Sequence, residues 1–88
     1  MDPAQSVEMI SVCSEDGSMQ PLRFRFHDED GCAQVARVLE ILSCREVKYV
    51  NVEAYVYTCR VRTDEREQIS TVRYSVRSHQ WLLAARPS

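Results

Sequence analysis

The clearest pattern lies in the C-terminal half of the chain, where apolar and polar positions alternate. Over residues 52–62 one face carries Tyr55, Tyr57, Cys59 and Val61, and the other carries Ala54, Val56, Thr58, Arg60 and Arg62. A period of two residues is the mark of a β-strand. Residues 69–77 alternate in the same way, and residues 81–85 are predicted to form a third strand. The polar segments 63–68 and 78–79 are predicted to be the turns between them.

The registers of these two hairpins can be compared with each other. A first turn centred on residues 65–66 places Tyr57 opposite Tyr74. A second turn centred on residues 78–79 places Tyr74 opposite Leu83 and Val76 opposite Trp81. Both turns therefore put the large side chains on the same side of one sheet, which a slip of one residue would undo. The pattern predicts a core centred on Tyr57, Tyr74, Val76 and Trp81.

The N-terminal half predicts another hairpin, because two apolar runs, 7–13 and 21–27, flank an Asp16-Gly17 turn. Leu22, Phe24 and Phe26 share one face of the second run. A two-residue turn would pair Phe24 with Met9. A three-residue loop with a bulge would pair Phe24 with Ile10 and Leu22 with Val12. We favour the three-residue loop because it buries more apolar surface.

Residues 33–42 admit two readings. Val35, Val38, Leu39 and Leu42 follow the i, i+3, i+4, i+7 spacing of an amphipathic helix, which Asp30 could cap. A strand through Val35 or through Val38 is the alternative. We favour the helix, at about residues 31–43, and expect residues 43–48 to connect it to the next strand.

Together these elements predict a mainly β fold: an antiparallel meander of five to six strands, forming a curved sheet or a small barrel, with room for one helix. The length of 88 residues corresponds to a single domain, residues 1–88. We expect residues 1–6 and 86–88 to be loose. The chain shows no signal-peptide pattern and no apolar run long enough to span a membrane. With four cysteines expected to be free thiols, it is expected to be a cytoplasmic protein.

The candidate chemistry is sparse. Neighbouring cysteines lie 19, 12 and 15 residues apart, unlike the close pairs of structural zinc sites. A metal site built in space from Cys13, Cys32, His27 and Cys44 is the alternative to no metal site. Nucleotide-binding and hydrolase motifs are missing from the sequence. We therefore expect no cofactor, no metal and no enzymatic activity, with a small metal-dependent or thiol enzyme as a minor alternative.

Arginine is the most informative residue type for function. Ten of the eleven basic residues are arginines, although the formal net charge is −2. Under the predicted registers, one face opposite the aromatic core carries Arg60, Arg62, Arg73 and Arg77, with Arg60 and Arg73 as diagonal neighbours. An ordinary solvated sheet face would explain these residues as well.

The functional hypothesis is a non-catalytic interaction domain that binds an acidic protein partner through these four arginines. The alternative is a small barrel that binds single-stranded nucleic acid. The net acidic charge disfavours nucleic acid, because its binders usually carry a basic excess. The sequence does not fix the oligomeric state.

The C-terminal segments also suggest a resemblance. Tyr57-Thr58-Cys59-Arg60, Val72-Arg73-Tyr74-Ser75-Val76 and Gln80-Trp81-Leu82-Leu83 make up the matching pattern. It resembles a family of short, uncharacterised bacterial proteins common in Firmicutes, over roughly residues 20–84. The resemblance implies a β-rich fold with a more strand-like segment at Val35–Leu42. The family has a Glu where this chain has Ser75, and the resemblance implies no activity.

Overall fold

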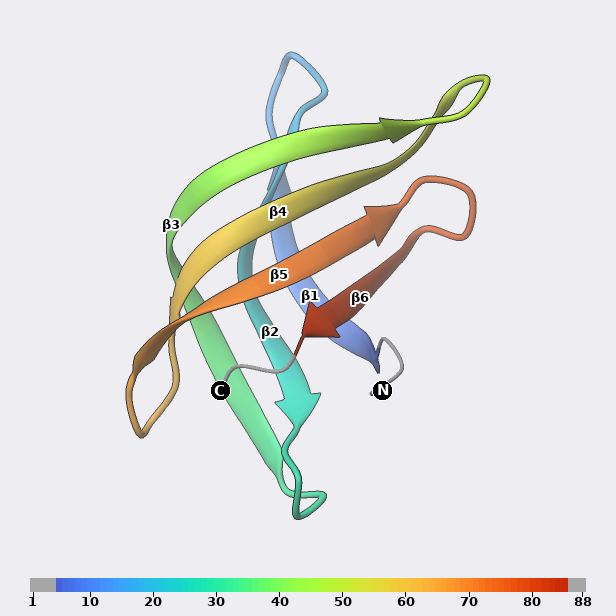
Figure 1. Ribbon diagram of the computed structural model, residues 1–88. Coiled ribbons are helices and arrows are strands. Elements are labelled where there is room, and N and C mark those ends of the chain that lie inside the picture. The colour runs from blue at the N-terminus through green and yellow to red at the C-terminus, as the bar shows by residue number, and fades with distance from the viewer. Residues whose placement is uncertain (1–4, 86–88) are drawn as a thin grey trace.

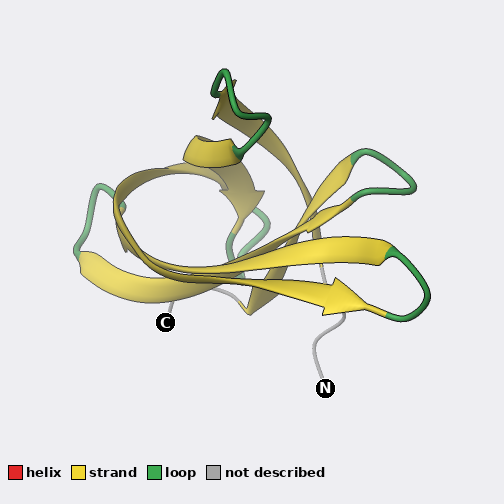
Figure 2. Cartoon of the chain, turned by 90° about the horizontal axis from the view of Figure 1, so that it is seen from above, coloured by secondary structure: helices red, strands yellow, loops and turns green. Residues whose placement is uncertain are grey.

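The structure is a computed structural model that describes residues 5–85, and within this range every regular element is a β-strand. The six strands follow one another along the chain: β1 (Gln5–Cys13), β2 (Met19–His27), β3 (Ala33–Lys48), β4 (Val52–Arg62), β5 (Glu67–Ser75) and β6 (Gln80–Ala85). Each pairs antiparallel with the next, and β6 returns to β1, which closes a barrel (Figures 1 and 2). The prediction of a small antiparallel barrel is confirmed.

The seam between β1 and β6 corrects one expectation about the chain ends. Gln5 pairs with Leu83, and Ser6 pairs with Leu82, so residues 5 and 6 belong to the barrel rather than to a loose end. The Gln5 side chain also accepts a hydrogen bond from the His27 backbone N–H, at 3.0 Å. Residues 1–4 and 86–88, also expected to be loose, lie outside the described residues.

The β1–β2 hairpin combines the two registers weighed from the sequence. Hydrogen bonds from the Ser14 N–H to the Ser18 carbonyl and from the Gly17 N–H to the Ser14 carbonyl close a three-residue loop. Gly17 has a φ of 88°, a conformation that costs glycine little. The loop length agrees with the favoured version, but Phe24 pairs with Met9, as in the alternative.

A β-bulge in β2 explains this mixture. Ile10 pairs with Arg23 and Ser11 pairs with Pro21, which leaves Leu22 as an extra residue in β2. Leu22 is consequently 43% exposed, and Pro21 is buried in its place. The predicted face of Leu22, Phe24 and Phe26 is therefore wrong for Leu22 only.

The helix predicted at about residues 31–43 is absent from the described chain. Residues 33–48 form the single long strand β3, which also includes the predicted connector 43–48. The alternative reading as a strand was correct. Bulges near Leu39 and Leu42 interrupt the alternation, so the side chains turned toward the barrel interior are Ala36, Val38, Ile41 and Cys44. Spacings of two and then three residues resemble a helical period, which misled the sequence reading.

The C-terminal hairpins have the predicted faces but not the predicted partners. Tyr57 pairs with Val72 and Tyr74 pairs with Trp81, a shift of two residues in each hairpin. An even shift leaves every side chain on its expected face. The first turn is shorter than predicted, because a hydrogen bond from the Thr63 N–H to the Arg66 carbonyl closes it at residue 66. Residues 67 and 68 therefore begin β5.

The core fills the barrel interior. Its buried side chains come from all of the described strands except β1, which contributes half-buried residues: Phe24, Phe26, Ala36, Tyr57, Cys59, Val61, Val72, Trp81 and Leu83. The Trp81 ring lies 5.6 Å from the Tyr57 ring and 5.0 Å from the Tyr74 ring, centroid to centroid. Tyr57 and Trp81 are buried as predicted. Tyr74 is half-buried, and Val76 lies in the β5–β6 turn rather than at the centre of the core.

The pairing between β2 and β3 is short, and this opens one side of the barrel. It extends only from the Arg23–Arg37 pair to the His27–Ala33 pair. Beyond Arg37, β3 bends away from β2 and runs across the top of the barrel, paired with β4 alone (Figure 1). The Tyr57 hydroxyl bridges the gap by donating to the Met19 carbonyl oxygen, at 2.7 Å.

Candidate functional site

The four arginines predicted to form one binding face separate into two groups. Arg60 and Arg62 lie on the outer side of β4, as expected. Arg73 lies opposite Val56 and Leu82 and is half-buried, and Arg77 lies in the β5–β6 turn. In the observed register Arg60 faces Ile69, so Arg60 and Arg73 are not the diagonal neighbours that the sequence suggested.

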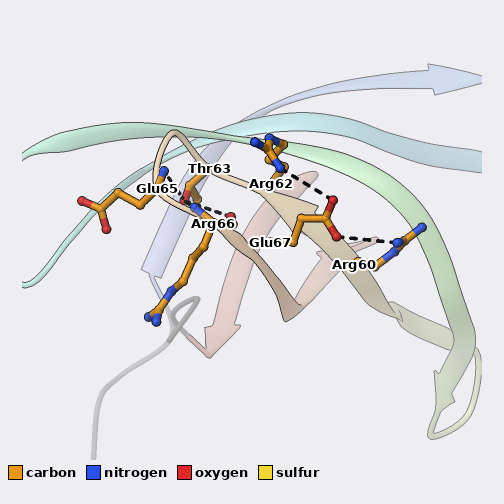
Figure 3. A network of polar contacts seen from close by, with 6 residues as sticks. All are labelled: Arg60, Arg62, Thr63, Glu65, Arg66 and Glu67. Atoms are coloured by element: carbon orange, nitrogen blue, oxygen red, sulfur yellow. Dashed lines mark hydrogen bonds and ion pairs between the residues drawn. The ribbon is translucent and has the colours of Figure 1, made fainter.

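Carboxylates form ion pairs with Arg60 and Arg62, the two arginines on the outer side of β4. Glu67 forms ion pairs with Arg60 at 3.6 Å and with Arg62 at 3.7 Å, next to the Thr63–Arg66 turn (Figure 3). Arg60 also contacts Glu40 at 3.4 Å. These side chains are about half exposed, so the pairs are weak, but they leave Arg60 with little unbalanced charge.

A different set of arginines comes together across three strands. Arg23 of β2 pairs with Arg37 of β3, and Arg37 pairs in turn with Arg62 of β4. We call Arg23, Arg37 and Arg62 the arginine row. Like charges directly opposite each other in a sheet repel. Within residues 5–85, Arg23 and Arg37 have no ion-pair partner, and Arg62 shares Glu67 with Arg60. Among the described residues, Arg23 and Arg37 are therefore opposed cations without a compensating carboxylate, whereas Glu67 partly neutralises Arg62.

Exposed aliphatic side chains flank the arginine row. Val35 and Leu39 precede and follow Arg37 on the same side of β3 and are 51% and 39% exposed, and Ile10, opposite Arg23, is 49% exposed. Two shallow depressions lie beside the row, one of about 310 Å³ along Arg23 and one of about 390 Å³ along Arg37. Val35 lines both of them. This part of the wall thus combines guanidinium groups with apolar surface, and one carboxylate borders each depression, Glu8 the first and Asp64 the second.

The sequence pattern does not connect Arg23 with Arg37 and Arg62. The connection depends on the β2–β3 register, and residues 33–42 had been read as a helix. A strand reading of this segment would have placed Val35 and Arg37 on one face by simple alternation. The sequence therefore indicates which face of the strand Arg37 lies on, but it does not indicate that Arg23 and Arg62 lie opposite Arg37.

A pocket of about 500 Å³ occupies the opening between the β1–β2 hairpin and the β3–β4 ribbon. Its lining mixes apolar and aromatic side chains, such as Met19, Ile41 and Tyr57, with the carboxylates of Asp16 and Glu46. Hydrogen bonds from the Ser18 hydroxyl and backbone N–H lower the pKa of Asp16, so this carboxylate stays ionised at neutral pH. Glu46 contacts Lys48 at 3.1 Å.

The buried Cys59 thiol and the Tyr57 phenol are poorly suited to chemistry. Burial, and to a smaller extent the neighbouring Cys44, raises the pKa of Cys59 to about 11, so Cys59 is a neutral thiol at physiological pH. Burial likewise raises the pKa of Tyr57 to about 12. Neither group is therefore ionised for nucleophilic attack or for metal binding.

The alternative metal site does not assemble. Cys13 adjoins the β1–β2 turn, whereas His27 and Cys32 flank the β2–β3 turn at the opposite end of the barrel. Among residues 5–85, no three histidine, cysteine or carboxylate side chains gather closely enough to hold a metal ion. All four cysteines are free, and only Cys59 is buried.

Comparison with known proteins adds no information on function. No family model matches the chain, and no curated protein or solved structure matches it. The resemblance to uncharacterised bacterial proteins stays a prediction. The described part of the chain contains no helix long and apolar enough to cross a membrane.

Proposed function

We propose that this chain is a non-catalytic interaction domain that binds an acidic protein partner through the arginine row. The observation that supports the proposal is the direct alignment of Arg23, Arg37 and Arg62 across three strands. Within the described part of the chain, Arg23 and Arg37 face each other without a carboxylate between them, and Arg62 has only a shared one, so an anionic partner would relieve the repulsion in the row. Guanidinium groups also pair with carboxylates in a fixed, forked geometry.

The aliphatic neighbours favour a protein over nucleic acid as the partner. Ile10, Val35 and Leu39 offer apolar contact on both sides of the charges, as protein interfaces do. Binding of single-stranded nucleic acid usually needs exposed aromatic rings for base stacking. Among the described residues, the one large aromatic side chain that is strongly exposed is Tyr49, which lies in the β3–β4 turn, away from the row.

The test is to reverse the central charge of the row. In the Arg37→Glu variant the introduced carboxylate would lie between Arg23 and Arg62, so the fold should be at least as stable as the wild type. Arg77→Glu makes the same change of charge in an exposed turn and serves as the matched control.

Each immobilised variant would be used to capture proteins from the source cell, and binding of captured candidates would be measured by calorimetry. We expect an acidic protein to bind the wild type and the Arg77→Glu variant, and to bind Arg37→Glu about tenfold more weakly or not at all. Equal binding to all three would contradict the proposal. Binding of a deoxythymidine oligonucleotide that Arg37→Glu abolishes, without a protein partner, would support the nucleic-acid alternative instead.

A further inference from the structure

The second half of β3 presents a long unpaired strand edge. From Val38 to Lys48 this strand pairs with β4 on one side, and within the described residues no strand pairs with it on the other. The edge lies along the top of the barrel in Figure 1, with only the β1–β2 hairpin behind it. An edge of this length is a template for pairing with another strand.

The side-chain directions along this edge are palindromic. Glu40 and Arg45 pair with Arg60 and Val56 and point outward, whereas Ile41 and Cys44 line the inner pocket. The bulge at the centre places Leu42 and Ser43 on the outer side together. Residues 40–45 therefore read out, in, out, out, in, out. Directly opposed residues of an antiparallel pair must point to the same side of the sheet, so this segment can pair with a copy of itself.

Charge complementarity selects the same register. An antiparallel pair of two β3 strands centred between Leu42 and Ser43 places Glu40 of each copy opposite Arg45 of the other. Twofold symmetry makes this contact twice. Arg45 has no ion-pair partner among the described residues, and Glu40 contacts only Arg60, at 3.4 Å. In this register Leu42, which is 48% exposed, would lie at the twofold axis beside its symmetry mate.

The inner side of the edge borders an open space. Ile41 and Cys44 border the pocket of about 500 Å³. In the self-paired arrangement, Ile41 of one copy lies opposite Cys44 of the other, so the inward side chains of the second copy would project toward this space. Backbone groups that are unpaired in the single barrel would gain partners as well.

We propose that two copies of this chain form a symmetric dimer by antiparallel pairing of their β3 edges, with Glu40 of each copy opposite Arg45 of the other. The pairing would join two barrels through one continuous sheet. It does not depend on the proposed function, because the arginine row lies outside residues 40–45.

The dimer can be tested by breaking it and restoring it with charges. The Glu40→Arg variant would place cations opposite Arg45, and the Arg45→Glu variant would place carboxylates opposite Glu40. Sedimentation equilibrium of the wild type should show a monomer–dimer equilibrium, and each variant alone should self-associate about tenfold more weakly. An equimolar mixture of the two variants should recover dimers, because both contacts then join opposite charges.

The mixture separates a specific interface from damage to the fold, since a misfolded variant would not be rescued by mixing. Arg77→Glu is the control for a charge reversal away from the edge and should leave the association unchanged. A wild type that stays monomeric at all accessible concentrations would overturn the proposal. Dimers that persist in both single variants, or variants that fail to associate when mixed, would overturn it as well.

Discussion

Tyr57 connects the two sides of the opening in the barrel. Its ring packs against Trp81 in the core, and its hydroxyl donates to the Met19 carbonyl oxygen of β2. The backbone ladder between β2 and β3 does not reach this region. Across this opening, a side-chain hydrogen bond joins β4 to β2, whereas neighbouring strands elsewhere in the barrel are joined by backbone hydrogen bonds.

We expect the Tyr57→Phe variant to lower the free energy of unfolding by about 1 kcal/mol, the usual net value of one hydrogen bond. Urea denaturation at neutral pH would measure it. Tyr55→Phe is the matched control, because the Tyr55 hydroxyl has no hydrogen-bond partner within the described residues. Equal losses in the two variants would show that the Met19 contact contributes nothing.

The same substitution should change the alkaline limit of stability. The pKa of Tyr57 is raised from 10.0 to about 12 in the fold by burial, so the fold favours the neutral phenol. Its contribution to stability is therefore complete below pH 10 and is lost as the pH rises toward 12. The Tyr57→Phe variant, which has no phenol to ionise, should lose less stability over this range than the wild type.

At the scale of the elements, β3 changes its pairing partner along its length. Residues 33–36 pair with β2 alone, Arg37 pairs with both β2 and β4, and the remainder of the strand pairs with β4 alone. The bulges near Leu39 and Leu42 let the strand bend between these regions. One strand thereby supplies Arg37 to the arginine row and Glu40 and Arg45 to the free edge.

The β4–β5 turn shows how a short polar segment fixes a register. The Thr63 hydroxyl is buried, accepts hydrogen bonds from the Glu65 and Arg66 N–H groups at 3.4 Å, and lies within 3.3 Å of the Arg66 carbonyl oxygen (Figure 3). These contacts hold the turn to four residues. The register in turn brings Glu67 between Arg60 and Arg62.

We expect Thr63→Val, which keeps the shape and removes the hydroxyl, to lower the free energy of unfolding by about 1 kcal/mol. Thr63→Ser keeps the hydroxyl and should lose clearly less. Thermal unfolding followed by circular dichroism would compare the two. A larger loss in Thr63→Ser than in Thr63→Val would mean that the methyl group, not the hydroxyl, matters at this position.

The sequence predicted those elements whose side chains alternate without interruption. The C-terminal strands, with Tyr57 and Val72 on one face, belong to this kind. Both of their turns were misjudged, which shifts each register by two residues and places Val76 in the second turn. Bulges defeated the reading elsewhere, because one inserted residue changes the period locally. Leu22 and Leu39 are such residues, and both are exposed although they were expected to face the core.

The candidate site was harder to predict for a related reason. Arg62 was identified from its own strand, but its role depends on Arg37, which stands beside it only in the folded sheet. Alternation gives the face of a residue, whereas cross-strand partners depend on register. Of the four arginines named from the sequence, Arg62 is the one that belongs to the row.

At the scale of the whole molecule, charge is separated more than the net value of −2 suggests. Arg23, Arg37 and Arg62 gather on one wall, whereas Asp16 and Glu46 border the pocket at the open side. A chain with a small net negative charge can therefore still attract an acidic partner at one place. Both proposed contacts use this local distribution rather than the overall charge.

The pairing of β1 with β6 also means that a circularly permuted chain could form the same barrel. Gln5 and Leu83 are paired neighbours, so the two ends of the barrel sequence meet. Joining residue 88 directly to residue 1 would give a circular molecule, which could be cut at the β3–β4 turn, where Tyr49 and Val50 are 90% and 81% exposed. None of the six strand pairings would be interrupted.

We expect this permuted chain, beginning at Val50 and ending at Tyr49, to reach the same native fold, as judged by its circular dichroism and by cooperative unfolding. It should fold more slowly, because the β3–β4 pairing, now local, would join opposite ends of the chain. Failure to fold would show that this hairpin must form as a connected unit. Success would mean that the order in which the strands leave the ribosome is incidental to the architecture.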